Sequence, residues 1–466
     1  MKLREGTRSR RRRLAAVSLL AAVALGAAAC GSKGGSSAAT GGSTGGSTSG
    51  ASESGGSIPT SVAAFPSYPK PSAGNGGSNG QIGLTSTSIA VGSPIAAGDG
   101  VSNAQIGTTL GAQAYYAMVN ASGGIYGRKL NLTEMNTTFD PGVGLGVFTK
   151  YIPQMFALNG TQSNVDAVAF NMTKSSGIPW VGEAFDPQFY VLPNQVNFQP
   201  TLPYGQASNY TYALYKKANP SISKVAIIWV NTSGIQPFVN SDVAGWKSVG
   251  VDTVYNVGIS GTVANLTPYV IQARAKGANV VDAFAEDITE AGRLAQAMQQ
   301  QGFNPTLKTN YAIYDASWHQ LAGSGAAGWQ TTPTYDSLPF LDDNALNATA
   351  GGKEFLYWVN KTASSQPLDV FTVEGWVQAA LFVQGLIKAG PNLTRANLLT
   401  SLKAIRNFDA DGLIANQPDP TAKGTLPATG CSNVQESTAT GYEQVLPTSG
   451  SFSCVPQTVY SYPTGS

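Results

Sequence analysis

Short apolar runs alternate with helical segments along most of the chain, and this alternation leaves few folds open. The clearest run is 224–230, KVAIIWV, which is almost entirely apolar and rich in β-branched residues. Such a run is expected for a strand that is covered on both faces of a sheet. Strands separated by helices of about ten to fifteen residues predict parallel sheets, because a parallel crossover needs a long connection.

Two series of this kind are expected, and together they predict an α/β fold. After 224–230, the second series contains helices at 237–249, 268–276 and 289–301 and strands at 251–257, 280–284 and 309–314. The first series contains strands at 88–91, 129–135, 155–158 and 178–181, with a Gly/Pro loop at 92–100 and a helix from about 106 to 120. Three later helices, at 355–360, 370–389 and 394–404, are expected to return to the first series.

The N-terminal thirty residues have the pattern of an export signal rather than of a folded domain. Residues 1–13 are basic and end in four consecutive arginines, and residues 14–29 form an apolar run of 16 residues. That run is short for a membrane-spanning helix and typical of a signal peptide. It ends in Ala27-Ala28-Ala29-Cys30, which resembles the bacterial lipobox. We therefore expect residues 1–29 to be removed and Cys30 to carry a lipid that anchors the protein to the outer face of the cell membrane.

Residues 30–80 are rich in Gly, Ser and Thr and show no apolar periodicity, which predicts a flexible tether. An ordinary cleavable signal with an unrelated cysteine is the alternative to lipidation. The arginine run is compatible with either the Sec or the twin-arginine export route.

Removal of the signal changes the charge and the cysteine count. Residues 1–29 hold seven basic residues and one acid, so the rest of the chain has 21 basic and 25 acidic residues and a formal charge of −4. No basic patch remains that would indicate nucleic-acid binding. Cys431 and Cys454 then form an even pair in an oxidising compartment, which predicts a disulfide. Two free thiols are the alternative.

Catalytic motifs are not found. The chain has one histidine, His319, which would have to serve any catalytic triad or metal site alone. No Gly-x-Ser-x-Gly elbow, Walker loop or His/Cys metal spacing is present. The sequence therefore predicts no enzyme, no metal site and no cofactor, and His319 is expected to be a surface or packing residue.

One block of the sequence is specific enough to indicate a family. Residues 119–130, VNASGGIYGRKL, followed by Phe139-Asp140-Pro141, resemble a signature of type I periplasmic binding proteins of the leucine/isoleucine/valine-binding branch. Residues 224–230, 277–281 and 374–380 are similar to later blocks of the same family, in the same order. The resemblance implies two Rossmann-like lobes joined by a three-crossing hinge, with a ligand cleft between them. It further implies an ABC permease and ATPase subunits as partners. The lobes are expected at 81–204 with 336–412 and at 205–335 with 413–466.

The resemblance also implies which loops face the ligand, since ligands bind beyond the carboxyl ends of parallel strands. The residues expected to bind the ligand are Ser163, Asn164, Glu183, Ala184, Phe185, Ser233, Glu286, Asp287, Tyr314 and Asp315. Ser163 and Asn164 could equally cap a helix, and each acid could be a solvated loop carboxylate.

Two departures from the family pattern bear on the ligand. Glu183 stands where the family has a glycine, and Phe185 stands where it has a threonine. They count against a plain branched-chain amino acid. The acids in the expected ligand loops together favour a cationic or amine-bearing ligand. An importer role is expected, and a ligand-sensing receptor of the same fold is the alternative.

Overall fold

The computed structural model describes one folded body of the 466-residue chain. The chain divides into two units, Met1–Ser49 and Gly50–Ser466, and every described residue belongs to the second unit. The predicted signal peptide, Cys30 and much of the predicted tether lie outside the described residues. The described residues are 57–63, 65, 74–95, 97, 106–138, 140–160, 165–184, 186, 189, 197–198, 206–231, 235–284, 288–363, 368–415 and 429–461.

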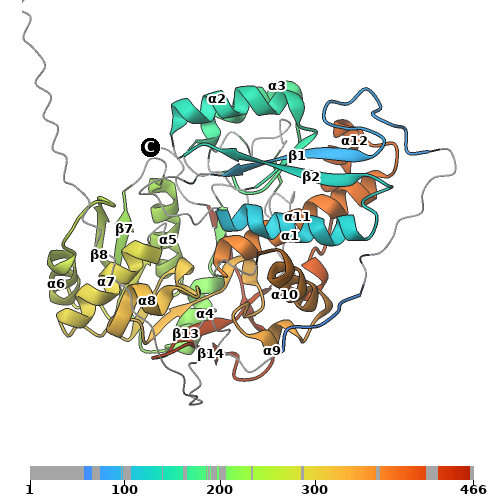
Figure 1. Cartoon of the computed structure of the whole chain (residues 1–466). Helices are drawn as coiled ribbons and strands as arrows, with labels where there is room; N and C mark the ends of the chain where they lie inside the picture. Colours follow the sequence, from blue (N-terminus) through green and yellow to red (C-terminus); the bar gives the residue numbers. More distant parts are fainter. Residues whose placement is uncertain are drawn as a thin grey trace, which may run out of the picture. The chain divides into compact units, whose positions relative to one another are not determined.

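Two sheets organise the body, and each has a parallel core (Figure 1). The first sheet is parallel throughout, in the order β2-β1-β3-β4-β5. Its strands are β1 (Ser88–Ile95), β2 (Lys129–Asn136), β3 (Ala157–Asn159), β4 (Trp180–Val181) and β5 (Asn197–Phe198). The second sheet has the order β14-β13-β11-β10-β9-β7-β8. Its strands are β7 (Lys224–Val230), β8 (Asp252–Ile259), β9 (Val280–Phe284), β10 (Leu307–Thr309), β11 (Trp329–Thr331), β13 (Val434–Ser437) and β14 (Tyr442–Leu446). Of these, β13 and β14 are antiparallel to their neighbours.

Twelve α-helices pack on these sheets within the described residues. They are α1 (Ile106–Ala121), α2 (Pro141–Tyr151), α3 (Phe170–Ser176), α4 (Tyr210–Ala218), α5 (Gln236–Ser248), α6 (Thr267–Ala275), α7 (Ile288–Gln300), α8 (Trp318–Ala322), α9 (Asp343–Leu346), α10 (Ala350–Ala363), α11 (Val370–Ala389) and α12 (Arg395–Leu402). The predicted helices and strands are present, with most boundaries within a few residues. The α/β class is therefore confirmed.

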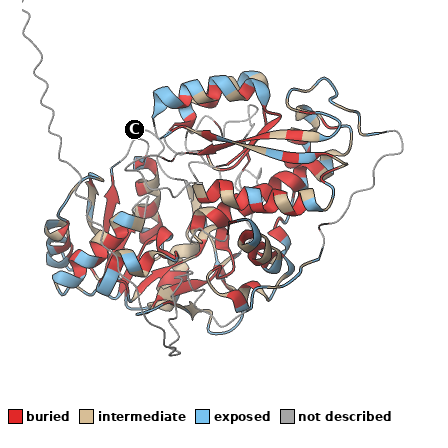
Figure 2. Cartoon of the chain, viewed as in Figure 1, coloured by how far each residue is buried: buried red, intermediate tan, exposed pale blue. Residues whose placement is uncertain are grey.

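Alternating side chains of β7 explain why that strand is apolar on both faces. Ala226 and Ile228 belong to a core cluster with residues of α6, α7 and α8. Val225 and Ile227 belong to another cluster, with residues of α4 and α5. Successive strand residues point to opposite faces, so each face of the sheet buries its own layer of helices. Figure 2 shows the buried strands of both sheets beneath helices whose outer faces are exposed.

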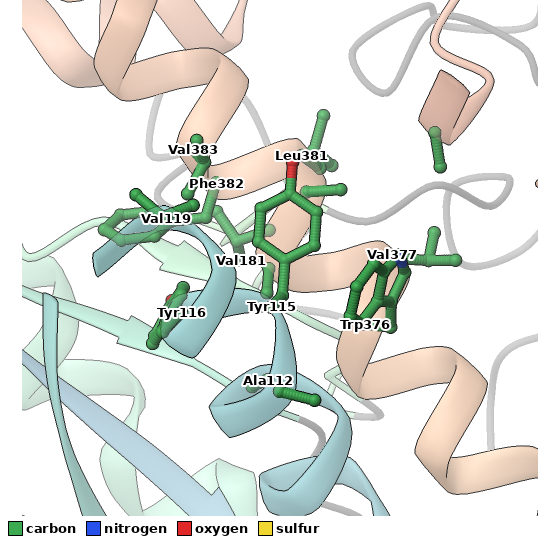
Figure 3. Close-up of a cluster of buried hydrophobic side chains, with 14 of the residues drawn as sticks. Ala112, Tyr115, Tyr116, Val119, Val181, Trp376, Val377, Leu381, Phe382 and Val383 are labelled. Carbon is green, nitrogen blue, oxygen red and sulfur yellow. The ribbon is translucent and has the colours of Figure 1, made fainter. Parts of the chain in front are cut away.

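The core beside the first sheet is built on the contact between α1 and α11. Tyr115 of α1 packs edge-to-face on Trp376 of α11, with ring centroids 4.9 Å apart (Figure 3). The two backbones approach so closely that a Cβ added at Gly375 would lie 1.9 Å from the carbonyl oxygen of Thr108. Among the described residues, α11 alone is long and apolar enough to cross a membrane, and 89% of its most apolar 18-residue stretch is buried. It is therefore a core helix of this body.

Three predicted elements have wrong boundaries. The helix expected at 355–360 is α10, which extends from Ala350 to Ala363. Strand β1 continues to Ile95 through residues that were expected to form a loop. Pro94 is tolerated because β1 pairs with β3 only at Val91 and Gly92, so no partner strand needs the missing N–H on that side. The strand expected at 309–314 ends at Thr309. There the Asn310 side chain accepts a hydrogen bond from the backbone N–H of Ala312 (2.8 Å) and begins a 3₁₀ turn.

The arginine of the signature block is buried and has a structural role. Arg128 is 1% exposed, and its guanidinium donates to the carbonyl oxygens of Thr85 (2.8 Å), Pro391 (2.9 Å) and Gly77 (2.8 Å) and also to that of Asn75. Burial lowers its pKa from the usual range. The end of the predicted tether is thus fixed on the body. Phe65 is buried in the core formed by α1 and α11, where its ring centroid lies 6.2 Å from that of Tyr115.

The C-terminal strands outside the second sheet take part in two short antiparallel pairs. β12 (Thr429–Ser432) pairs with β15 (Ser453–Pro456), and Cys431 is bonded to Cys454 across that pair, as the cysteine count predicted. Closing a loop of 23 residues stabilises the folded state by about 3 kcal/mol in the chain-entropy model. β16 (Val459–Ser461) pairs with β6 (Gln206–Ser208) near the first connection between the sheets.

The two later connections between the sheets run antiparallel to each other. The N–H of Leu338 donates to the carbonyl of Leu413 (2.8 Å), and that of Ala415 donates to the carbonyl of Asp336 (3.0 Å). These paired segments form what we call the hinge pair, residues 334–338 and 413–415.

Candidate functional site

Four of the ten residues expected to bind a ligand are described, namely Glu183, Ala184, Tyr314 and Asp315. The other six, Ser163, Asn164, Phe185, Ser233, Glu286 and Asp287, lie outside the described residues. The lobe boundaries likewise remain a prediction. The site is therefore built from the described loops that follow β4 and β10 and from the elements that they contact.

The loop after β4 places Glu183 at the end of the first sheet. Gly182 precedes it, with its N–H donating to the carbonyl of Phe198 (2.9 Å). A Cβ at Gly182 would lie 2.0 Å from the carbonyl oxygen of Gly160, and its φ of 149° disfavours other residues. The backbones that leave β3 and β4 therefore cross in contact. Glu183 is partly exposed there, whereas Ala184 is 4% exposed.

Glu183 contacts the hinge pair through Tyr335. The hydroxyl of Tyr335 is hydrogen-bonded to Glu183 and accepts a hydrogen bond from Nε2 of Gln378 (2.8 Å). Tyr335 and Asp336 both have positive φ, 52° and 53°, which is uncommon for residues other than glycine. The hydroxyl of Tyr210 donates to Asp336 at 2.6 Å. Side-chain hydrogen bonds on both sides therefore hold this strained part of the hinge.

Glu374 is a second acid at the same place, contributed by α11. It is 5% exposed, and its Oε1 accepts a hydrogen bond from the hydroxyl of Thr334 at 2.8 Å. The residue thus joins α11, a core helix beside the first sheet, to the hinge pair. Glu374 belongs to the block 374–380 that resembles the family, but that resemblance implied no ligand-binding role for it.

The loop after β10 brings Asp315 to the N-terminus of α11. Asp315 is 8% exposed, and its Oδ1 accepts hydrogen bonds from the N–H and the hydroxyl of Ser317, both at 2.6 Å. The next residue, Ala316, donates its N–H to the carbonyl of Leu368 (3.3 Å). Asp369 then caps α11 by accepting from the N–H and the hydroxyl of Thr372, both at 2.7 Å.

Tyr314 lies in the core rather than beside these acids. It is 1% exposed, and its ring packs edge-to-face on Phe340 and on Tyr442, with centroids 4.7 Å apart in each pair. Burial raises its pKa. His319, expected to be a packing residue, contacts the carbonyl of Thr438 through Nε2 (3.2 Å) and the ring of Tyr442.

Four acids form what we call the acid cluster: Glu183, Glu374, Asp369 and Asp315. The charge of Glu374 interacts with those of Glu183 and Asp369, and the charge of Asp369 interacts with that of Asp315. Burial raises the pKa of Glu183 to about 7. Burial and then the charge of Glu183 raise the pKa of Glu374 well above its usual range. Burial also raises the pKa of Asp369 to about 7, with a further contribution from Asp315. The pKa of Asp315 is itself raised by burial.

No positive side chain compensates the acid cluster within the described part of the chain. The one ion pair found there joins Arg293 to Glu290 on α7. Buried carboxylates whose charge is not paired with a cation are costly even when they accept hydrogen bonds, so they either bind protons or bind a cation. The cluster therefore favours a positively charged group as its partner.

Two of the four acids were missed by sequence reasoning, although weak signals for them exist. Asp369 precedes the apolar run 370–389, which is the position of a helix N-cap. Glu374 is the one acid within that mostly apolar run, and an acid in a buried helix indicates a special partner. Neither signal places the residue beside Glu183 or Asp315, because that proximity depends on how the sheets are connected.

Comparison with known protein families identifies one family that matches most of the chain. The sequence pattern of the family described as "Periplasmic binding protein" matches residues 89–439. No curated protein sequence matches the chain.

Several solved structures have the same fold. A fatty acid ABC transporter substrate-binding protein from Thermomonospora curvata is 18% identical, with a TM-score of 0.61, and the match covers 78% of this chain and 93% of that one. An ABC transporter substrate-binding protein from Aeropyrum pernix is 15% identical, with a TM-score of 0.63 and coverage of 81% and 96%. A branched-chain amino acid transporter substrate-binding protein from Streptococcus pneumoniae, in complex with isoleucine, is 13% identical, with a TM-score of 0.59 and coverage of 79% and 100%. At these identities the similarity shows the fold.

Proposed function

The chain belongs to the periplasmic binding protein family, and from this premise we propose that it is the substrate-binding lipoprotein of an ABC-type importer. In this proposal Cys30 carries the lipid anchor on the outer face of the bacterial membrane. The two lobes close on a small polar solute, and the protein then delivers the solute to the permease. Hinge closure around a ligand is a common motion of two-lobed binding proteins. The hinge pair, with its strained Tyr335 and Asp336, is the segment that would move.

The proposed ligand is a small solute that carries an amine, either an amino acid or a related amine compound. The observation that carries this proposal is the acid cluster, in which four carboxyl groups have raised pKa values and no described cation is paired with them. An ammonium group at the cluster would lower the cost of ionising these acids and would bind most strongly where water is excluded.

The neighbours of known structure do not decide the ligand. One is named for fatty acids and another holds isoleucine, and these ligands differ in charge and polarity. The identity of the ligand therefore depends on residues of this chain. Glu183 and Asp315 are the two acids that were predicted from the sequence and that also belong to the acid cluster.

Replacement of either acid by its uncharged isostere is expected to weaken binding of an amine ligand. For Asp315→Asn and for Glu183→Gln we expect a loss of about 2 kcal/mol or more, which is roughly a 30-fold increase in Kd, because a desolvated charge–charge contact is lost. Calorimetric titration with the amine that gives the largest thermal shift measures the change.

The matched controls are Asp252→Asn and Glu134→Gln, which change exposed acids on β8 and β2. Both should bind the amine as the unaltered protein does. Unchanged affinity in both Asp315→Asn and Glu183→Gln would count against the acid cluster as the ligand site.

A further inference from the structure

A cavity of ≈140 Å³, partly open to solvent, lies beside the second sheet at the end of α7. It is bounded by α7 and by the segments that enter β10 and β11. Its walls combine apolar side chains with polar ones: Met298, Gln299, Phe303, Asn304, Lys308 and Trp329. Tyr314 and Asp315 follow the carboxyl end of β10, whereas this cavity is at the amino ends of β10 and β11. Since those two strands are parallel, the cavity and the acid cluster are at opposite ends of the strands.

Lys308 is the one charged residue that lines the cavity. It is 8% exposed, although lysine is almost never buried without a partner for its charge. Its Nζ donates to Oδ1 of Asn304 (3.1 Å) and to the carbonyl oxygen of Ala327 (2.8 Å). An ammonium group has three donor hydrogens, so these two acceptors leave one hydrogen for a further partner.

The charge of Lys308 is not paired with an acid among the described residues. Glu436 is the acid whose charge favours the ammonium form, but its Oε2 accepts a hydrogen bond from Gln330 instead (2.6 Å). Burial accordingly lowers the pKa of Lys308. The two neutral acceptors and the charge of Glu436 compensate the ammonium only in part, and an anion in the cavity would compensate it at close range.

We propose that this cavity binds a small organic carboxylate, with the carboxylate on Lys308 and its short hydrocarbon part against Met298, Phe303 and Trp329. The size agrees with such a ligand, because an apolar protein cavity of about 150 Å³ accommodates benzene, which has six heavy atoms. The amides of Gln299 and Asn304 supply further N–H donors in the lining. The site is independent of the proposed solute site, since it shares no residue with the acid cluster.

The test is a titration of the ¹⁵N-labelled protein with butyrate, followed by NMR at the indole N–H of Trp329 in the cavity wall. Butyrate has six heavy atoms, and we expect saturable binding with a Kd on the order of 1 mM. Butyramide has the same shape without the charge, and butylamine has the opposite charge. Both should bind at least about tenfold more weakly, at equal ionic strength set with chloride. Equal shifts with butyrate and butyramide, or no saturable shift with butyrate, would overturn the proposal.

Two variants locate the binding at Lys308. Lys308→Met removes the charge and keeps the length of the side chain, and it should abolish the butyrate response. Asn304→Asp places a carboxylate beside Nζ within the chain, and it should also abolish the response while raising the Tm of the free protein.

The control Lys276→Met changes an exposed lysine at the end of α6 and should bind butyrate like the unaltered protein. Butyrate binding that persists in both Lys308→Met and Asn304→Asp would place the ligand elsewhere and refute the site. Asn304→Asp replaces the amide nitrogen by an oxygen and keeps the size and shape of the side chain. It therefore tests the proposal even if Lys308→Met does not fold.

Discussion

The protein is expected to be more stable at pH 5 than at pH 8, by several kcal/mol of unfolding free energy. Every described carboxyl group whose pKa is shifted has its pKa raised: Glu183, Asp242, Asp282, Asp315, Glu354, Asp369, Glu374 and Asp411. Burial is the largest cause in each case. Asp242 and Asp282 show the effect most clearly, because they lie together and the pKa of Asp282 is about 6.

The sign follows from proton linkage. These carboxyl groups have a higher pKa in the folded state than in the unfolded state. At a pH between the two pKa values, the folded state therefore binds more protons than the unfolded state does. The contribution of each group to stability is therefore complete below the unfolded pKa, near 4, and is lost as the pH rises through the folded pKa of about 6 to 7. Chemical denaturation at pH 5, 6, 7 and 8 measures this decline.

Asp369→Asn isolates one group in this series. Asparagine caps a helix about as well as aspartate does, so the cap of α11 should persist. We expect the variant to be about 2–4 kcal/mol more stable than the unaltered protein at pH 8, a range that allows for the partial exposure of Asp369, and nearly equal to it below pH 4.

Asp252→Asn, at an exposed position, should show no such pH-dependent gain. A free energy of unfolding that rises from pH 5 to pH 8 would contradict the raised pKa values.

Trp376→Ala is expected to destabilise the protein by about 3–5 kcal/mol, which is the usual cost of truncating a buried tryptophan. Trp376 is 1% exposed and packs against Tyr115 (Figure 3), with ring centroids 4.9 Å apart. It also packs against Phe355, with ring centroids 5.5 Å apart. The same helix carries Glu374 and Gln378, so the loss should also loosen the contacts that hold the hinge pair. Urea denaturation at one pH gives the difference in unfolding free energy.

Trp358→Ala is the matched control, because Trp358 is a partly exposed tryptophan of α10 beside the same core. Its truncation should cost about 1–2 kcal/mol. If the two variants lost equal stability, the contact between α1 and α11 would not be the centre of this core.

The fold could be predicted where a segment's own residues decide its structure. Lys224–Val230 and Val370–Ala389 have the predicted bounds, because each is a long apolar run with clear limits. The end of β10 could not be predicted, since it depends on the side chain of Asn310 bonding its own turn. The buried position of Phe65 also required the structure, because the two aromatic residues of this Gly/Ser-rich segment, Phe65 and Tyr68, give no periodic signal.

The candidate site was predictable only in part and for a related reason. The family resemblance indicated Glu183 and Asp315 because each follows a strand of a parallel sheet. Glu374 and Asp369 join them through the connections between the sheets, and such contacts between distant segments leave no trace in the local sequence. The raised pKa values depend on this assembly. The charge of Glu183 raises the pKa of Glu374, and the charge of Asp315 raises the pKa of Asp369, only when the loops and α11 are in place.

The most direct measurement for the proposed function is a thermal-shift screen followed by calorimetric titration of the folded body, residues 50–466, at pH 7.5. The panel comprises amino acids, polyamines, amides and aromatic acids, and each amine hit is compared with its N-acetylated form. We predict saturable binding of at least one amine-bearing compound and loss of that binding on N-acetylation. A ligand at 100 times its Kd would stabilise the folded state by about 2.7 kcal/mol. Binding of only uncharged or anionic compounds, or no saturable binding by a folded protein across the panel, would contradict the proposal.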